Sequence, residues 1–307
     1  MPLAQPLPLA MPATGAGTCV WDAGATLGEG AVWSPGEQAL YWVDILGRKL
    51  HRLTLATGGR TSWTYNEEVS ALAERASAPG LVLALRRGLA LWNPADPGTA
   101  PHYLCPLDAD LPGNRCNDGK CDAAGRFWAG TMDFGCEQPT GSLYRVDANG
   151  QATRHDSGFA VTNGPTWTAD QRTLLFNDTV NGCVLAYDFD AATGSLANRR
   201  VWLQFGPDDG VPDGMCTDAA GRIWICHWGG SCVSCHDPAS ARELGRITLP
   251  VSQVTSCAFG GADLRTLYVT SARVGLDADA LTREPLAGGL FAFPVAEPGQ
   301  LAHRFAG

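Results

Sequence analysis

One pattern recurs about six times along the chain and constrains its fold more than any other feature. Each copy has a polar or acidic residue, a short apolar run, a turn such as Asp122-Ala123-Ala124-Gly125-Arg126, and then an aromatic segment. Helical hairpin repeats are shorter, at about 34 residues, whereas a four-stranded propeller blade has the length seen here. We therefore expect an all-β chain, a six-bladed β-propeller with four-stranded blades around a central channel. The copies start at intervals of 42, 45, 49, 50 and 42 residues, at Leu27, Val69, Asn114, Asn163, Asp213 and Thr255.

The segments that follow the turns have the composition of strands. Leu40–Val43, Phe127–Ala129 and Ile223–Ile225 are short, aromatic and β-branched. Their turns contain Gly, Asp or Asn, which supply the left-handed backbone conformation that a tight hairpin needs. The sequence shows no sustained helical period of apolar residues, so almost no helix is expected.

The two ends of the chain are expected to close the ring. Thr18–Trp21 precedes the first full copy and Gly289–Phe293 follows the last, and their pairing would remove an exposed sheet edge. Residues 1–14 contain four Pro and no Lys or Arg, which differs from a secretory signal and predicts a disordered tail. Residues 15–307 are expected to form a single propeller domain.

Charge and hydropathy restrict the partners of the protein. Lys and Arg total 22 and Asp and Glu total 31, for a net charge of −9, and no basic run is present to neutralise phosphates. Nucleic acid is therefore not expected as a partner. No stretch approaches the roughly 20 apolar residues of a membrane span, so no membrane association is expected either.

The chain contains 11 cysteines, which bear on its compartment. Most fall inside expected strands, where a reduced thiol acts as a small apolar side chain. Cys226, Cys232 and Cys235 lie close in sequence to His227 and His236, which raises zinc binding as an alternative. A second paired Cys-x-x-Cys is missing, so the preferred interpretation is buried thiols in a reducing cytoplasm, and cytoplasmic is the expected location.

Polar residues occupy the starts of the expected inner strands, which a propeller brings together at one end of its channel. Glu29, the run Asn114–Asp118, Asn163 and Asp213 hold this position in different blades, up to 184 residues apart. Two carboxylates that face each other in a narrow channel repel unless a cation or a shared proton intervenes. Carboxylate and amide oxygens are hard ligands, suited to Ca²⁺, Mg²⁺ or Mn²⁺ and, less selectively, to Fe²⁺ or Zn²⁺.

The same residues also have a purely structural interpretation. Asn-Gly at 163–164, Asp-Gly at 213–214 and Asn-Asp-Gly at 117–119 are ordinary turn signals. Glu29 stands between two glycines and is harder to explain in this way. The case for a site rests on the occurrence of polar residues at equivalent positions in several blades.

Five segments resemble the SMP-30/gluconolactonase/luciferin-regenerating enzyme family, in particular its bacterial sugar lactonases. The resemblance implies a six-bladed propeller with one catalytic divalent cation, one of the five named above, and a small sugar lactone as substrate. The resemblance does not indicate a protein partner. Matched motif to motif, it assigns the metal ligands to Glu29, Asn163 and Asp213, and substrate binding to Arg115 and Asn117. The segments occur in order between about residues 18 and 296: GEGAVWSPGEQALYWVDI, NRCNDGKCDAAGRFWAGTMD, TNGPTWTADQRTLLFNDT, GVPDGMCTDAAGRIWICHWGG and TSCAFGGADLRTLYVTSAR.

One motif departs from the family. Some members have a further substrate-contacting Glu just after a Gly-Thr-Met sequence. Here Gly130-Thr131-Met132 continues as Asp133-Phe134-Gly135-Cys136-Glu137, so Asp133 and Glu137 are the weak candidates for that role. The departure leaves the identity of the sugar open.

The implied activity is metal-dependent hydrolysis of an aldono-1,4- or 1,5-lactone to the aldonic acid, in the oxidative catabolism of sugars. Attack by water develops charge on the carbonyl oxygen, which a cation with open coordination positions stabilises. Asp213 is the expected general base, although bonding to the cation would lower its basicity, and activation of water by the cation alone is the alternative. The competing functions are a non-catalytic propeller that binds calcium or a protein partner, and a promiscuous esterase or phosphotriesterase.

Overall fold

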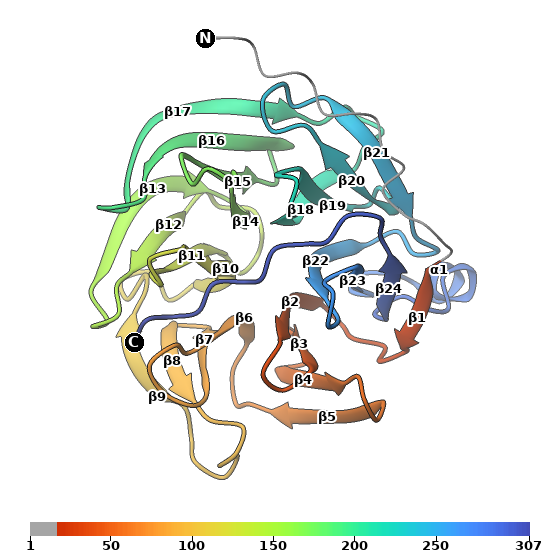
Figure 1. Ribbon diagram of the computed structural model, residues 1–307, viewed down its shortest axis with the longest axis horizontal. Helices are drawn as coiled ribbons and strands as arrows, with labels where there is room; N and C mark the ends of the chain where they lie inside the picture. The colour runs from red at the N-terminus through yellow and green to blue at the C-terminus, as the bar shows by residue number, and fades with distance from the viewer. Residues whose placement is uncertain (1–16) are drawn as a thin grey trace.

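The computed structural model describes residues 17–307 as six four-stranded antiparallel sheets arranged around a central axis (Figure 1). The predicted all-β, six-bladed propeller is confirmed. The tail predicted for residues 1–14 lies outside the described residues. The first strand of each blade lies nearest the axis and starts within two residues of the position expected from the repeat. These inner strands are β2 (Gly28–Ser34), β6 (Val69–Glu74), β10 (Asn114–Cys121), β14 (Thr162–Trp167), β18 (Val211–Thr217) and β22 (Val254–Gly260).

Three further strands complete each blade from the axis outward. The second strands are β3 (Ala39–Asp44), β7 (Leu81–Leu85), β11 (Phe127–Asp133), β15 (Thr173–Asp178), β19 (Ile223–Trp228) and β23 (Thr266–Ser271). The third strands are β4 (Lys49–Thr54), β8 (Gly88–Trp92), β12 (Gly141–Val146), β16 (Cys183–Asp190), β20 (Cys232–His236) and β24 (Leu290–Pro294). The outermost strands are β5 (Gly59–Thr64), β9 (His102–Pro106), β13 (Ala152–Phe159), β17 (Ser195–Gln204), β21 (Glu243–Thr248) and β1 (Thr18–Trp21).

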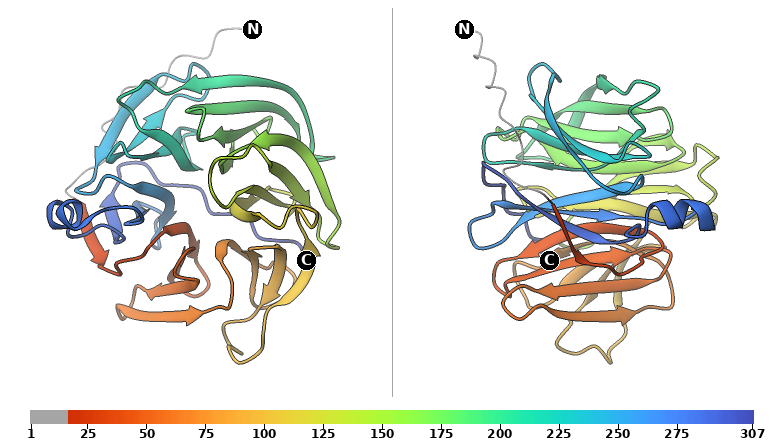
Figure 2. Two further views of the ribbon diagram at one scale, coloured as in Figure 1. Left: turned by 180° about the vertical axis from the view of Figure 1, so that it is seen from behind. Right: turned by 90° about the vertical axis from the view of Figure 1, so that its right-hand side faces the viewer.

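The ring closes as the sequence predicts. The N-terminal strand β1 pairs antiparallel with β24, with Thr18 opposite Ala292 and Trp21 opposite Leu290, so the sixth sheet has the order β1-β24-β23-β22. Within residues 17–307 the sole helix is α1 (Ala278–Arg283), and no helix in this range is long and apolar enough to span a membrane. Figure 2 shows α1 projecting from the side of the ring opposite the C-terminal segment.

The repeated Asp-Ala-Ala-Gly-Arg turn has a structural reason, which is the same in blades three and five. Asp218 is fully buried, and its Oδ2 accepts hydrogen bonds from Arg222 Nε at 2.6 Å and from Trp224 Nε1 at 2.9 Å. Asp122 accepts from Arg126 Nε at 2.7 Å and from Trp128 Nε1 at 2.9 Å in the same way. One buried carboxylate therefore ties each turn to the aromatic strand that follows it, which satisfies all three polar groups.

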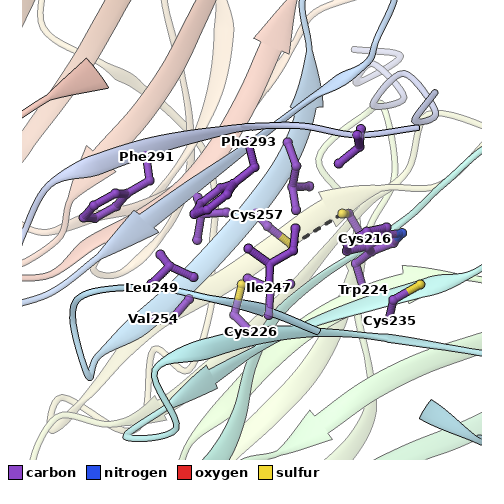
Figure 3. Packing of buried hydrophobic residues seen from close by; sticks show 14 of the residues in the cluster. Cys216, Trp224, Cys226, Cys235, Ile247, Leu249, Val254, Cys257, Phe291 and Phe293 are labelled. Carbon is purple, nitrogen blue, oxygen red and sulfur yellow. Dashed lines mark hydrogen bonds between the residues drawn. The ribbon is translucent and has the colours of Figure 1, made fainter. Parts of the chain in front are cut away.

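The core lies between the blades, and most of the cysteines are part of it. Figure 3 shows Cys216, Cys226 and Cys257 packed with Trp224 and the neighbouring apolar side chains of blades five and six. The Sγ atoms of Cys216 and Cys257 are 3.4 Å apart, and all eleven cysteines are free thiols. The interpretation of the cysteines as small apolar core residues agrees with this packing.

The histidines beside this cysteine group bind a serine. The Oγ atom of Ser234 lies 2.6 Å from Nε2 of His227 and 2.7 Å from Nε2 of His236. Their Nδ1 atoms lie 2.8 and 2.9 Å from the backbone carbonyl oxygens of Asp209 and Ala241. Each Nδ1 therefore donates to its carbonyl oxygen, and the two Nε2 atoms are acceptors that share the single hydroxyl hydrogen of Ser234.

The C-terminal segment crosses the end of the channel where the inner strands finish (Figure 1). Gln300 donates to the carbonyl oxygen of Asp218 at 2.9 Å, and Phe305 exchanges backbone hydrogen bonds with Glu74 and Ala76. The Phe305 side chain is fully buried in the apolar cluster of blades two and three. The segment thus covers one end of the channel and leaves the other end, at the strand starts, for a site.

We expect Phe305→Ala to lower the free energy of unfolding by about 3–5 kcal/mol, because it removes a buried aromatic ring and leaves a cavity. Leu301→Ala is the matched control in the same segment, since Leu301 is 49% exposed and its truncation should change stability by about 0.5 kcal/mol or less. Urea denaturation followed by tryptophan fluorescence measures both variants. Equal stability of the two would show that the segment is not anchored through Phe305.

Candidate functional site

The five residues singled out from the sequence line one cavity of about 500 Å³ at the starts of the inner strands. Glu29 comes from β2, Arg115 and Asn117 from β10, Asn163 from β14 and Asp213 from β18. Each is buried, with an exposed fraction between 3% and 6%. The rest of the wall is mainly apolar: Leu27, Leu46, Met132, Phe134, Cys136, Val161, Val180, Val211, Trp228 and Val274.

A β-bulge in each inner strand aims these side chains at the channel. The register with the second strand shifts between Glu29 and Val32 in the first blade, and between Pro212 and Met215 in the fifth. The glycines after Glu29 and Asn163 have positive φ values of 57° and 76°, which side chains with a Cβ rarely adopt. The Asn-Gly turn signal at Asn163 is therefore real, but the turn is a bulge inside a strand that also presents the amide to the cavity.

A chain of hydrogen bonds fixes the amide groups of the site. Arg115 Nη1 donates to Asn117 Oδ1 at 2.5 Å. Asn117 Nδ2 donates to Asn163 Oδ1 at 2.8 Å and to the carbonyl oxygen of Thr162 at 2.6 Å. Asn163 Nδ2 donates in turn to Thr179 Oγ1 at 3.0 Å. Because each amide donates to a defined acceptor, the oxygen of Asn163 has a fixed direction and keeps one lone pair for a ligand.

Glu29 and Asp213 form a strained pair of buried carboxyl groups. Burial and the charge of Asp118 raise the pKa of Glu29 to about 8. Burial and the charge of Glu29 raise the pKa of Asp213 well above its ordinary value, and the two carboxyl groups are within hydrogen-bonding reach of each other. Asp213 Oδ1 is buried and has no hydrogen-bond partner. The pair therefore holds a proton or needs a positive charge between its oxygens.

Asp118 is a third channel carboxyl group, to which the sequence led us to assign no role. Its Oδ1 accepts from the backbone nitrogen of Gly119 at 2.6 Å, whereas its Oδ2 is buried without a partner. Burial raises its pKa to about 6, although the nearby charge of Lys120 acts in the opposite direction. In a regular strand Asn117 and Asp118 would face opposite sides, but the register shift between Cys116 and Gly119 interrupts this alternation, and the charge of Asp118 acts on both Glu29 and Asp213.

Asp133 and Glu137, the weak candidates for a further substrate contact, do not line the cavity. The Asp133 carboxylate accepts from the backbone nitrogens of Glu137 and Gln138, both at 3.0 Å, and so holds its own loop together. The Glu137 side chain is exposed to solvent. Phe134 and Cys136 from the same loop line the cavity in their place.

Comparison with known proteins identifies the family. The model for the SMP-30/Gluconolactonase/LRE-like region matches residues 27–273, which is most of the chain. The chain belongs to this family. Regucalcin from Gallus gallus is 36% identical over 279 residues, covering 89% of this chain and 92% of that protein. The Bacillus subtilis protein named "Putative sugar lactone lactonase YvrE" is 35% identical, covering 93% of this chain and 97% of that protein.

Solved structures of family members have the same fold. A regucalcin from Agrobacterium tumefaciens, described as a calcium-binding protein, superimposes with a TM-score of 0.90 at 32% identity, covering 96% of this chain and 98% of that one. Luciferin-regenerating enzyme superimposes with a TM-score of 0.87 at 30% identity, covering 95% and 99%. The family thus includes proteins named for lactone hydrolysis and a protein named for calcium binding.

The donor set of the cavity fits a divalent cation. Within residues 17–307 no three His, Cys, Asp or Glu side chains are grouped as a metal site, so a cation here requires the amide oxygen of Asn163 beside the two carboxylates. The unpartnered Oδ1 of Asp213 and the raised pKa of Glu29 are both relieved by a positive charge. These all-oxygen ligands suit hard cations.

We expect a saturating divalent cation to raise the melting temperature by a few degrees over chelator-treated protein. A ligand that binds only the folded state adds about 2.7 kcal/mol at a hundredfold excess over its Kd. Glu29→Gln should lose this increase, whereas Glu297→Gln, an exposed glutamate outside the cavity, should keep it. Differential scanning calorimetry with Ca²⁺, Mg²⁺, Mn²⁺ and Zn²⁺ measures the shift. An undiminished shift in the Glu29 variant would exclude Glu29 as a ligand.

Proposed function

We propose that the protein hydrolyses an aldono-1,4- or 1,5-lactone to the aldonic acid, with a divalent cation held by Glu29, Asn163 and Asp213. The observation that carries this proposal is the convergence of two buried carboxyl groups and a fixed amide oxygen in one cavity. Arg115 and Asn117 supply donors in the same cavity. The lactonase names within the family support the chemistry, and the cyclic ester made by oxidising an aldose at C1 is a substrate of this class.

The cation, when bound, would polarise the ring carbonyl and acidify water, which is the standard chemistry of such a site. The protein residues orient the substrate. Asn117 is held by Thr162 and Asn163, so its amide keeps one direction while the lactone binds. Arg115 is likewise anchored through Nη1 on Asn117, which leaves its other nitrogens to donate to sugar oxygens.

Asp213 is the proposed general base. Its Oδ1 atom has no hydrogen-bond partner, so it can accept a proton from water held at the carbonyl. A cation on the same carboxylate lowers its basicity, which favours the alternative in which water loses its proton without a protein base. The apolar side chains around the cavity exclude bulk water and strengthen every charge interaction inside.

A cation-binding propeller without catalysis is the second candidate, favoured by the calcium-binding description of the Agrobacterium regucalcin. Such a protein needs the carboxylates of Glu29 and Asp213 but has no use for Arg115 and Asn117 as donors. We further propose a cytoplasmic location, because all eleven cysteines are free thiols.

We expect Asp213→Asn to lower kcat/KM by at least about a hundredfold, because it removes a ligand charge and the proposed base. Asn117→Ala should cost less, about 1–3 kcal/mol in transition-state stabilisation, because it removes one hydrogen-bonding group. The measurement is kcat/KM on the best substrate from a panel of 1,4- and 1,5-lactones, corrected for spontaneous hydrolysis.

Metal analysis of the same samples separates the outcomes. Near wild-type turnover in a metal-loaded Asp213 variant would make Asp213 a replaceable ligand and favour water activation by the cation alone. Cation binding without hydrolysis of any lactone in the panel would favour the non-catalytic candidate.

A further inference from the structure

The loop that follows β11 contributes the aromatic ring of Phe134 to the cavity wall and contributes no carboxylate. Phe134 and Cys136 line the cavity, whereas the carboxylates of Asp133 and Glu137 are turned to the loop backbone and to solvent. The backbone nitrogen of Phe134 donates to the carbonyl oxygen of Gly113 at 2.9 Å, which anchors the loop beside the start of β10. This wall of the cavity therefore offers no negative charge to a bound sugar.

Two guanidinium groups lie against the same ring. The Cζ atom of Arg86 is 5.0 Å from the centre of the Phe134 ring, and that of Arg115 is 5.9 Å from it. Arg86 comes from the turn between β7 and β8, and Arg115 from β10, so two blades contribute one positive charge each. An adjoining cavity of about 280 Å³ is lined by both arginines, and Arg115 lines the main cavity as well.

In the described part of the chain neither arginine has a carboxylate at short hydrogen-bonding distance, although the charges of Glu29 and Glu68 act on Arg115. Within residues 17–307 Arg115 forms no ion pair with a carboxylate, although its side chain is buried. Its hydrogen bonds to Cys116 and Asn117 both use Nη1, which leaves Nε and Nη2 available. Arg86 has one carboxylate neighbour, Glu68, at the long distance of 3.7 Å.

We propose that the preferred substrate is a sugar lactone with an anionic group, a carboxylate or a phosphate, at the end of the chain remote from the lactone carbonyl, and that Arg115 and Arg86 bind this group. The inference rests on the proposed lactonase function. Guanidinium groups match the planar oxygens of carboxylate and phosphate, and such charge-assisted pairs are stronger than bonds to a neutral hydroxyl. The net charge of −9 repels anions, so their recognition depends on a local pair of this kind.

The cavity presents groups of both charges to a substrate. The carboxyl groups of Glu29 and Asp213 attract a cation, and the reacting carbonyl with it. Arg115 lines both the main cavity and the adjoining arginine-lined cavity, so its guanidinium group is available to a substrate that extends from one into the other. A substrate with an ester carbonyl at one end and an anion at the other has a group for each.

Matched substrate pairs test the proposal on the metal-loaded protein. Galactono-1,4-lactone and galactaro-1,4-lactone differ by a terminal carboxylate, and glucono-1,5-lactone and its 6-phosphate differ by a terminal phosphate. We expect kcat/KM to be roughly tenfold or more higher for the anionic member of one pair, mainly through a lower KM. A preference within the galactono/galactaro pair indicates a carboxylate site, and a preference within the glucono-1,5-lactone pair indicates a phosphate site.

Arginine variants test the residues. Arg86→Gln should reduce the preference about tenfold, and Arg200→Gln, which removes an exposed charge on β17, should leave it unchanged. Phe134→Glu places a carboxylate beside both guanidinium groups and should reverse the preference. Equal kcat/KM within both pairs, or an unchanged preference in the Arg86 variant, overturns the proposal while leaving the lactonase function in place.

Binding of open-chain compounds separates failure of the proposal from failure of the function. If no lactone is hydrolysed, calorimetry with galactarate and with galactitol, the polyol that has no carboxylate, measures the anion site alone. Tighter binding of galactarate that is lost in the Arg86 variant supports the anion site in a protein without lactonase activity. Equal binding of galactarate and galactitol refutes both proposals.

Discussion

Closure of the ring by the pairing of β1 with β24 is the interaction on which the rest of the structure depends. Six inner strands share one channel only if the first and last blades are neighbours, and this pairing makes them so. The contact reaches the site directly, because Thr255 Oγ1 of the sixth blade donates to the carbonyl oxygen of Gly28 at 2.5 Å. The backbone that carries Glu29 is therefore held by the opposite end of the chain.

The sequence predicts features that follow from local chemistry. The starts of the inner strands were predictable because each depends on a turn and an aromatic strand, and the Asp122 and Asp218 turns repeat the same buried hydrogen bonds. Asp118 was missed because a bulge, set by pairing with β11, overrides the alternation of side chains. The burial of Phe305 also escaped prediction, since the C-terminal segment lacks a strand pattern and is positioned by two distant blades.

The candidate site lowers the stability of the folded protein. Glu29, Asp118 and Asp213 are buried carboxyl groups with raised pKa values, and two of their oxygens have no partner. Each such group destabilises the folded state unless it is neutralised or bound. The well-packed blades offset this cost elsewhere, for example where Asp218 is fully paired with Arg222 and Trp224. Polar groups in the blades thus have hydrogen-bond partners, whereas some of those at the site do not, as expected for a binding site.

The C-terminal segment closes one end of the channel, so that the channel opens to solvent at the other end. On its side the remaining cavity is about 80 Å³, which is the space of a few water molecules and far less than a sugar needs. Phe134 and Val180 are the large apolar residues of the site lining that are exposed to solvent, so a molecule that reaches Glu29 and Asp213 enters and leaves past them. A molecule entering the site and a molecule leaving it therefore use the same opening and compete for it.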